Sequence, residues 1–169
     1  MVETNSLHIF SRRAATLPRC AHGFSMTELL ITLAVAAILT TIAVPSFNEL
    51  IATKKAQMCA SDLYVALAKT RSEAVTLNNN AKLQPNAGGW SAGWQILDVN
   101  NKALDNHAAE AAVTIVGPAA VTYGASGRLP AGAAAPMFVI STTSGATVNY
   151  QCVSVNLGGR PYMTAAAAC

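Results

Sequence analysis

Charged side chains are scarce in this 169-residue chain, at 11% of its residues, against about 25% in an average soluble domain. Aromatic residues are also few, at 6%. The net charge is +3. Much of it comes from Arg12, Arg13 and Arg19 near the start, which are offset there only by Glu3. Beyond Gly23, eight basic and seven acidic side chains leave a net charge of +1. So weak a field gives no reason to expect nucleic-acid binding from charge alone. The length allows one small domain with an anchor.

Groups able to carry out catalysis are equally sparse. Of the three histidines, His8 and His22 lie in the basic N-terminal segment and only His107 follows it, which argues against a Ser-His-Asp site or a histidine-rich metal site. No CxxC pair, P-loop or dinucleotide fingerprint occurs. Asp98 and Asp105 could form a carboxylate pair, but isolated loop carboxylates are far more often solvated. The loop around them could also bind calcium, although its spacing lacks the EF-hand pattern. We therefore predict no enzyme, cofactor or metal site.

Four cysteines are present: Cys20, Cys59, Cys152 and Cys169. Cys152 and Cys169 bracket the C-terminal segment, and a bridge between them would contribute roughly 3 kcal/mol in the chain-entropy model. Such a bridge requires an oxidising compartment such as the periplasm. Cys59 is expected to be an unpaired, buried residue on a helix. The alternative is that all are free thiols.

A long uncharged run occupies Leu29 to Asn48. Twenty helical residues span about 30 Å, the thickness of the hydrocarbon core of a bilayer. The preceding arginines favour a cytoplasmic N-terminus and an exported C-terminal part, although Lys54 and Lys55 weaken the asymmetry. The alternatives are a secretory signal peptide, whose apolar region is shorter, and an uncleaved signal anchor.

Glu28 directly precedes this run. A carboxylate at membrane depth is costly, so its presence indicates a function and a partner. A cut after Gly23 would release an amine at Phe24, from the same chain or from a neighbouring subunit. The alternative is that Glu28 simply lies at the membrane interface.

The helix is expected to continue from Phe24 to about Leu77, with Asn78 to Asn80 as its stop because asparagine tolerates the left-handed conformation. Pro45 should kink or locally melt it. Small residues in its apolar half favour close packing against related helices. One amphipathic face is predicted beyond the membrane, formed by Ala56, Ala60, Leu63, Leu67, Thr70, Ala74 and Leu77.

Beyond residue 80, short β segments alternate with turn signals. We predict an antiparallel sheet packed on the exported half of the helix, an α+β fold, with loops at 100–111 and 130–136. The predicted strands are Trp94–Val99, Ala112–Val116, Val121–Tyr123, Met137–Ile140, Thr147–Val155 and Arg160–Met163.

The segment 23–30, GFSMTELL, resembles the class III signal of type IV prepilins and type II secretion pseudopilins. The resemblance implies that a membrane-bound prepilin peptidase/methyltransferase cuts after Gly23 on the cytoplasmic side and N-methylates Phe24. It also implies that Glu28 neutralises the terminal amine of an adjacent subunit. Pro45 matches a proline commonly found near the end of the first apolar block.

C-terminal blocks resemble the pseudopilin H / FimT branch of this family. They are GWSAGWQI at 89–96, YGASGR ending at Arg128, and LGGR ending at Arg160. Trp90 and Trp94 can also be interpreted as core or edge residues of the first strand. Some FimT-like minor pilins bind DNA through a Gly-Arg-Ala-Arg segment. Here Tyr162 stands in place of the second arginine, and one arginine neutralises little phosphate, although a tyrosine can stack on a base.

The resemblance implies a pilin fold, with a long N-terminal transmembrane helix packed on a C-terminal antiparallel β domain. The expected organisation is a cleaved leader at 1–23, a transmembrane and assembly half at 24–52, and a periplasmic domain at 53–169 that includes helix 53–77. The expected function is a minor pilin or pseudopilin of a type IV pilus or a type II secretion pseudopilus. It would be a single-pass protein of the bacterial inner membrane with other pilins as partners and no cofactor. DNA binding and an anchored enzyme are the less favoured alternatives.

Overall fold

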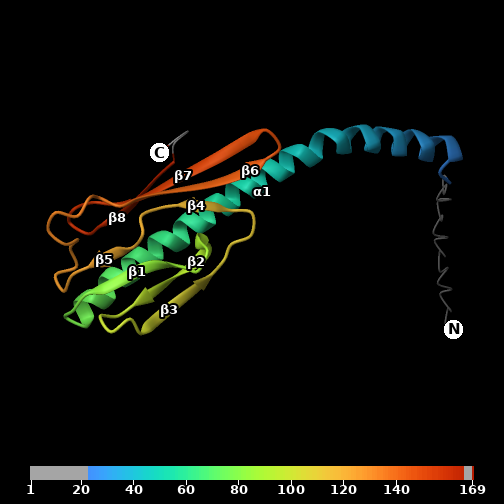
Figure 1. Cartoon of the computed structure of the whole chain (residues 1–169). Helices are drawn as coiled ribbons and strands as arrows, with labels where there is room; N and C mark the ends of the chain where they lie inside the picture. The colour runs from blue at the N-terminus through green and yellow to red at the C-terminus, as the bar shows by residue number, and fades with distance from the viewer. Residues whose placement is uncertain (1–22, 166–168) are drawn as a thin grey trace, which may run out of the picture. The chain divides into compact units, whose positions relative to one another are not determined.

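The computed structural model describes residues 23–165 and 169, and it divides the chain into two compact units, Met1–Leu39 and Thr40–Cys169. One long helix, α1 (Met26–Thr76), begins in the first unit and ends in the second, which contains all the strands (Figure 1). The strands are β1 (Ala81–Asn86), β2 (Gly89–Leu97), β3 (Ala103–Ala108), β4 (Thr114–Val116), β5 (Val121–Tyr123), β6 (Met137–Ser144), β7 (Thr147–Val155) and β8 (Pro161–Ala165).

The C-terminal half of α1 is amphipathic as predicted. Six of the seven residues of the predicted face are buried, and only Leu77, just beyond the helix, is 46% exposed. The helix stops where Asn78 adopts a φ of 47°, and the amide of Asn79 then donates to the carbonyl of Ala74 at 3.1 Å. Pro45 lies inside an uninterrupted helical segment, so it does not melt the helix locally.

The strands form two four-stranded antiparallel sheets, where the sequence predicted one. Their orders are β3-β2-β1-β5 and β4-β6-β7-β8. The longest pairing joins β6 to β7, from Met137 opposite Ser154 to Ser144 opposite Thr147. This hairpin has a two-residue turn of Gly145 and Ala146, in which glycine supplies the positive φ of 58° at little steric cost.

Three sequence predictions in the first sheet were wrong. The predicted loop at 100–111 contains strand β3, which pairs with β2 from Gly93 opposite Ala108 to Leu97 opposite Ala103. Residues 81–86 were given no strand but form β1, and β2 begins at Gly89 rather than Trp94. These segments become strands because neighbouring strands satisfy their backbone groups, which overrides a weak local propensity.

One hydrophobic core joins α1 to both sheets. The ring of Trp90 on β2 meets that of Phe138 on β6 edge-to-face, with centroids 4.8 Å apart, and its indole nitrogen donates to the carbonyl of Pro118 at 2.7 Å. Trp90 and Trp94 are 5% and 2% exposed, as their reading as core residues predicted. The hydroxyl of Thr142 on β6 donates to the carbonyl of Ala52 on α1 at 2.9 Å.

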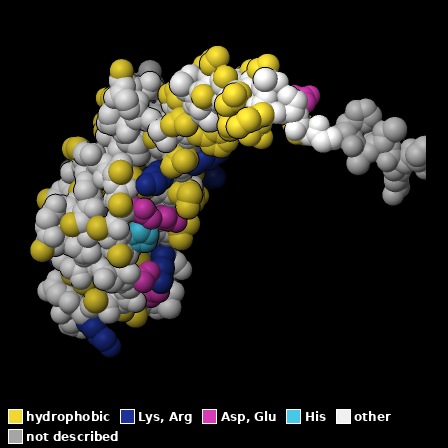
Figure 2. Space-filling model, turned by 90° about the vertical axis from the view of Figure 1, so that its right-hand side faces the viewer, with side chains coloured by type: hydrophobic (Ala, Val, Ile, Leu, Met, Phe, Trp, Pro, Cys, Tyr) yellow, Lys and Arg dark blue, Asp and Glu magenta, His cyan; other side chains and the backbone are white. Residues whose placement is uncertain are grey.

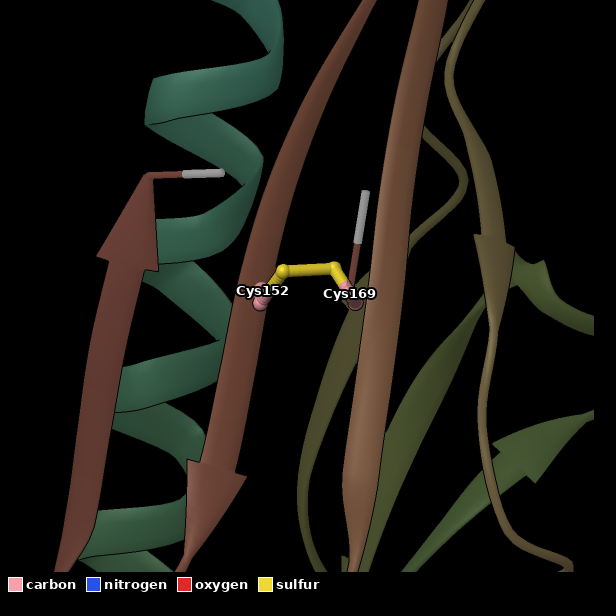
Figure 3. The surroundings of a disulfide bond; sticks show 2 residues. All are labelled: Cys152 and Cys169. Atoms are coloured by element: carbon pink, nitrogen blue, oxygen red, sulfur yellow. A yellow bond between two sulfur atoms is a disulfide. The ribbon is translucent and has the colours of Figure 1, made fainter. Parts of the chain in front are cut away.

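A disulfide joins Cys152 on β7 to Cys169 (Figure 3), with their Cα atoms 5.7 Å apart. It ties the end of the chain to the second sheet, and closure of this short loop contributes about 3 kcal/mol in the chain-entropy model. Cys59 is buried with a free thiol, and burial raises its pKa to about 12. A neutral thiol in an apolar setting packs as a small hydrophobic side chain.

Candidate assembly site on the N-terminal helix

The start of α1 is fixed by hydrogen bonds around Glu28. The backbone at Gly23 to Ser25 is not helical, and the helix begins at Met26. The Ser25 amide donates to the Glu28 carboxylate at 3.4 Å, and the Thr27 amide donates to the Ser25 hydroxyl at 3.3 Å. This is a variant of a capping box, in which serine and a glutamate three residues later stabilise a helix N-terminus. The Glu28 carboxylate is therefore turned back toward the segment that holds Phe24.

The described part of the first unit is exposed along its whole length. Phe24 is 75% exposed. Apart from Glu28 no charge occurs between Gly23 and Leu39. Helix α1 is long and apolar enough to cross a membrane, judged by length and composition. The exposed large apolar side chains of this part of the helix are Leu29, Leu30, Ile31, Leu33, Val35, Ile38 and Leu39. Apolar side chains exposed on all sides of a helix are typical of a segment that lies in lipid or in a helix bundle.

A second exposed apolar feature lies on α1 within the larger unit. Val44, Ile51, Met58 and Val65 recur every seven residues, and each is more than half exposed. Seven residues are close to two helical turns, so the four side chains form one line along the helix. The neighbouring residues at 52, 56, 59 and 63 are buried against the sheets. We call this line the assembly stripe. In Figure 2, hydrophobic side chains, drawn in yellow, gather on the part of α1 that leads to the grey residues.

Pro45 lies one residue from the first member of the stripe. It borders a groove that Ile42, Ser46, Asn48 and Glu49 form with the turn between β6 and β7. The resemblance of the N-terminal segment points to Pro45 but not to the assembly stripe. The interval of seven residues that defines the stripe is nevertheless visible in the sequence.

The two Gly-Arg segments predicted from the sequence lie against each other. A Cβ placed on Gly159 would collide with the carbonyl oxygen of Gly127 and would reach within 3.2 Å of the Cα of Arg128. Both glycines have positive φ, 70° and 80°, so a side chain at either is disfavoured. The Arg71 side chain of α1 donates to the Gly127 carbonyl at 2.8 Å. The turns that carry Arg128 and Arg160 are thus adjacent, and both side chains are exposed.

Tyr162 follows on β8 and is 47% exposed. It pairs in register with Ser154 of β7. The adjacency of the two turns could not be predicted from the sequence, because one follows β5 of the first sheet and the other follows β7 of the second sheet.

The loop carboxylates have separate partners instead of forming a pair. Asp98 accepts hydrogen bonds from the amides of Asn100 and Lys102, both at 2.8 Å. Asp105 on β3 forms an ion pair with Lys69 at 2.8 Å, and the hydrogen bond from Lys69 holds the pKa of Asp105 below its usual value. These contacts account for both side chains as structural groups.

His107 also has structural contacts. The His107 ring stacks on Trp94, with centroids 4.1 Å apart and planes 7° from parallel. Its Nε2 lies 3.7 Å from a carboxylate oxygen of Asp62 on α1. Together with the Lys69–Asp105 pair, this contact holds the edge strand β3 to the helix. Within residues 23–165 and 169, no three side chains of histidine, cysteine, aspartate or glutamate gather as a metal site would require.

A long apolar helix with a capped acidic start, half exposed and half packed on antiparallel sheets, defines the chain as a pilin-like subunit. The chain belongs to the family described as type II transport protein GspH, whose sequence pattern its residues 60–159 match. Residues 18–44 match the prokaryotic N-terminal methylation motif. The C-terminal blocks had suggested the pseudopilin H / FimT family, and the family match is consistent with that prediction.

Solved structures share this fold. The type IV minor pilin FimU of Pseudomonas aeruginosa (strain PAO1) aligns with a TM-score of 0.56 and 22% identity, over 69% of this chain and 96% of that one. The minor pseudopilin EpsH from the type 2 secretion system of Vibrio cholerae aligns with a TM-score of 0.52 and 10% identity, over 66% and 97%. At these identities the likeness shows the pilin fold alone. None of the curated proteins searched matches the sequence.

Proposed function

We propose that this chain is the precursor of a minor pilin or pseudopilin, incorporated into a filament through α1. The peptidase/methyltransferase removes residues 1–23 and methylates Phe24, and the exported domain follows the helix into the periplasm. The observation that carries the proposal is the apolar, exposed N-terminal half of α1 with its single acidic residue, Glu28, at the capped start. Such a helix is stable in lipid or against other helices of the same kind.

Glu28 is the residue that links processing to assembly. Leader removal leaves the Phe24 amine four residues before the Glu28 carboxylate. In a medium of low dielectric constant, an amine and a carboxylate are each costly alone and attract each other strongly. Pairing with the amine of a neighbouring subunit would therefore select the position of an incoming chain. Pro45 and the assembly stripe would set how the next part of the helix packs.

The two similar solved structures support a filament subunit, but they do not decide between a type IV pilus and a type II secretion pseudopilus. One is described as a type IV minor pilin and the other as a minor pseudopilin of a type 2 secretion system. The family described as type II transport protein favours a pseudopilus that assists secretion. We propose no catalytic role, because the names of these relatives describe filament subunits and the titratable loop residues already have structural partners.

The assembly stripe gives a direct test of helix packing. Met58→Lys is expected to reduce incorporation into filaments, because it places a charge in an apolar helix contact. Gln57→Lys is the matched control, since Gln57 is the adjacent exposed residue off the stripe. The measurement is the amount of each variant in sheared filaments relative to the membrane pool. Equal incorporation of the two lysine variants would refute the role of the stripe.

A second candidate function is DNA binding at the paired Gly-Arg turns. One observation favours it: the contact of Gly159 with Gly127 puts Arg160 beside the turn of Arg128, so two arginines, with Tyr162 nearby, are available to one nucleic acid. Two phosphate contacts still give modest affinity with a weak dependence on salt.

Anisotropy titration of the mature chain with single-stranded DNA, repeated at several salt concentrations, tests this candidate. Each of Arg128→Ala and Arg160→Ala should reduce the slope of log affinity against log salt by about 1. Lys102→Ala, in an exposed turn beside β3, should leave the slope unchanged. Identical titrations for all three variants and the unaltered chain would remove DNA binding from consideration.

A further inference from the structure

The turn of the β6–β7 hairpin reaches α1 where the apolar run ends. A groove separates the two, lined on the helix by Ile42, Pro45, Ser46, Asn48 and Glu49 and on the hairpin by residues 144–147. A second groove continues along the helix to Lys55 and is bordered by Thr142 and Thr143. The hydrogen bond from Thr142 to the Ala52 carbonyl fixes the hairpin against the helix. Whatever surrounds the helix at Ile42 and Pro45 therefore also surrounds the turn.

The helix at this level has the composition of a membrane interface. Ile42, Phe47 and Leu50 are all more than half exposed. Glu49 is the first charge after the apolar run, and Lys54 and Lys55 follow within two turns. Long basic side chains near the end of an apolar span can place their charges in the headgroup region. From Ile42 to Glu49 the helix rises about 10 Å, comparable with the roughly 5–8 Å of headgroup region on each side of a bilayer.

The hairpin itself has no charge. No residue from Leu129 to Gly159 is Asp, Glu, Lys, Arg or His. At the turn, Gly145, Ala146 and Thr147 are exposed, and Val148 is 42% exposed. Solvent-facing hairpins usually carry charges. Small, uncharged side chains remove the main cost of placing a turn near lipid, because its backbone polar groups can still hydrogen-bond to headgroups and water.

We propose that the β6–β7 turn, residues 144–147, lies in the headgroup layer of the membrane before the subunit enters a filament, with phospholipid filling the groove beside Pro45. This inference rests on the proposed membrane anchor. It gives the globular domain a second point of attachment, so that the domain is held against the bilayer surface instead of swinging from the helix. The competing occupant is the apolar helix of a neighbouring subunit.

A fluorescent probe at the turn tests the proposal. The chain beginning at Phe24 is placed at low density in vesicles of phosphatidylethanolamine and phosphatidylglycerol, and Ala146→Cys is labelled with an environment-sensitive dye. The matched control is Leu157→Cys, at the opposite end of β7, because Leu157 is 67% exposed and distant from the groove in the fold (Figure 1). Labelling is selective, because Cys59 is buried and Cys152 and Cys169 are bridged.

We expect the dye at position 146 to emit at shorter wavelength than the dye at 157. We also expect lipids carrying a nitroxide at the headgroup to quench it, and a water-soluble quencher to reach it less. Vesicle flotation tests the membrane anchor separately from the contact of the turn with the headgroup layer. A chain that does not float contradicts the anchor and this proposal with it. A chain that floats but shows the same aqueous emission at positions 146 and 157 contradicts the turn contact alone. The turn contact is also contradicted if the dye at position 146 is quenched by a labelled neighbouring subunit and not by labelled lipid.

Discussion

Replacing Glu28 by glutamine is expected to leave the chain in the membrane and to abolish its incorporation into the filament. Glutamine serves in a capping box as glutamate does, so the bond from the Ser25 amide and the start of α1 are retained. Only the negative charge is lost. An amine deprived of its buried partner costs about 3–5 kcal/mol, which corresponds to a loss of incorporation of about a hundredfold or more.

Glu49→Gln is the matched control for this experiment, because Glu49 is an exposed carboxylate on the same helix. Glu28→Ala separates the two roles of the side chain, since alanine removes the cap as well as the charge. Quantitative immunoblotting measures the amount of each variant in sheared filaments and in membranes. Wild-type incorporation of Glu28→Gln would refute charge pairing, and a defect in Glu28→Ala alone would assign the effect to the helix cap.

Removal of the leader is the second large effect that we expect. Gly23 lies ahead of the helix, and among the described residues no atom beyond its chain neighbours comes within 4 Å of the place where a Cβ would stand. The bond between Gly23 and Phe24 is therefore outside the helix and, within the described part of the chain, unobstructed. Gly23→Ile adds a β-branched side chain at this bond and should leave the leader attached.

Without the cut there is no free amine for Glu28 to pair with, so Gly23→Ile should also be absent from filaments while remaining in the membrane. Gly88→Ala changes a glycine distant from the site and serves as a control for expression, although its φ of 108° makes some loss of stability expected. Efficient incorporation of uncut Gly23→Ile would separate assembly from processing and contradict the proposed pairing.

The long helix was predictable because its signals are local. Burial of Ala56, Leu63 and Thr70 follows from their spacing, and the stop at Asn78 follows from the tolerance of asparagine for positive φ. The disulfide between Cys152 and Cys169 was expected because these two cysteines bracket the C-terminal segment.

Strand β3 could not be predicted in this way. Its sequence, ALDNHA, contains no β-branched residue, and it forms at the sheet edge because β2 pairs with its backbone while Lys69 and Asp62 on α1 contact Asp105 and His107. The division of the strands into two sheets likewise depends on long-range pairing, which leaves no mark on the hydrophobic pattern of any one strand.

In the candidate assembly site, too, local features were predictable from the sequence and contacts between distant segments were not. Gly23, Phe24 and Glu28 were predicted from adjacent residues with a known spacing. The contact between the turns of Arg128 and Arg160, and the approach of the β6–β7 turn to Pro45, arise only when distant segments pack together. Sequence reasoning therefore predicted the N-terminal signal from local residues, but it did not predict the surfaces that long-range packing forms in the larger unit.

The intact mass of the chain purified from membranes of a cell that contains the peptidase tests the central claim most directly. The account predicts a chain that begins at Phe24, has one methyl group on its terminal nitrogen and retains the Cys152–Cys169 disulfide. A chain that still begins at Met1, or one cut at the far end of the apolar run near Pro45, would contradict it.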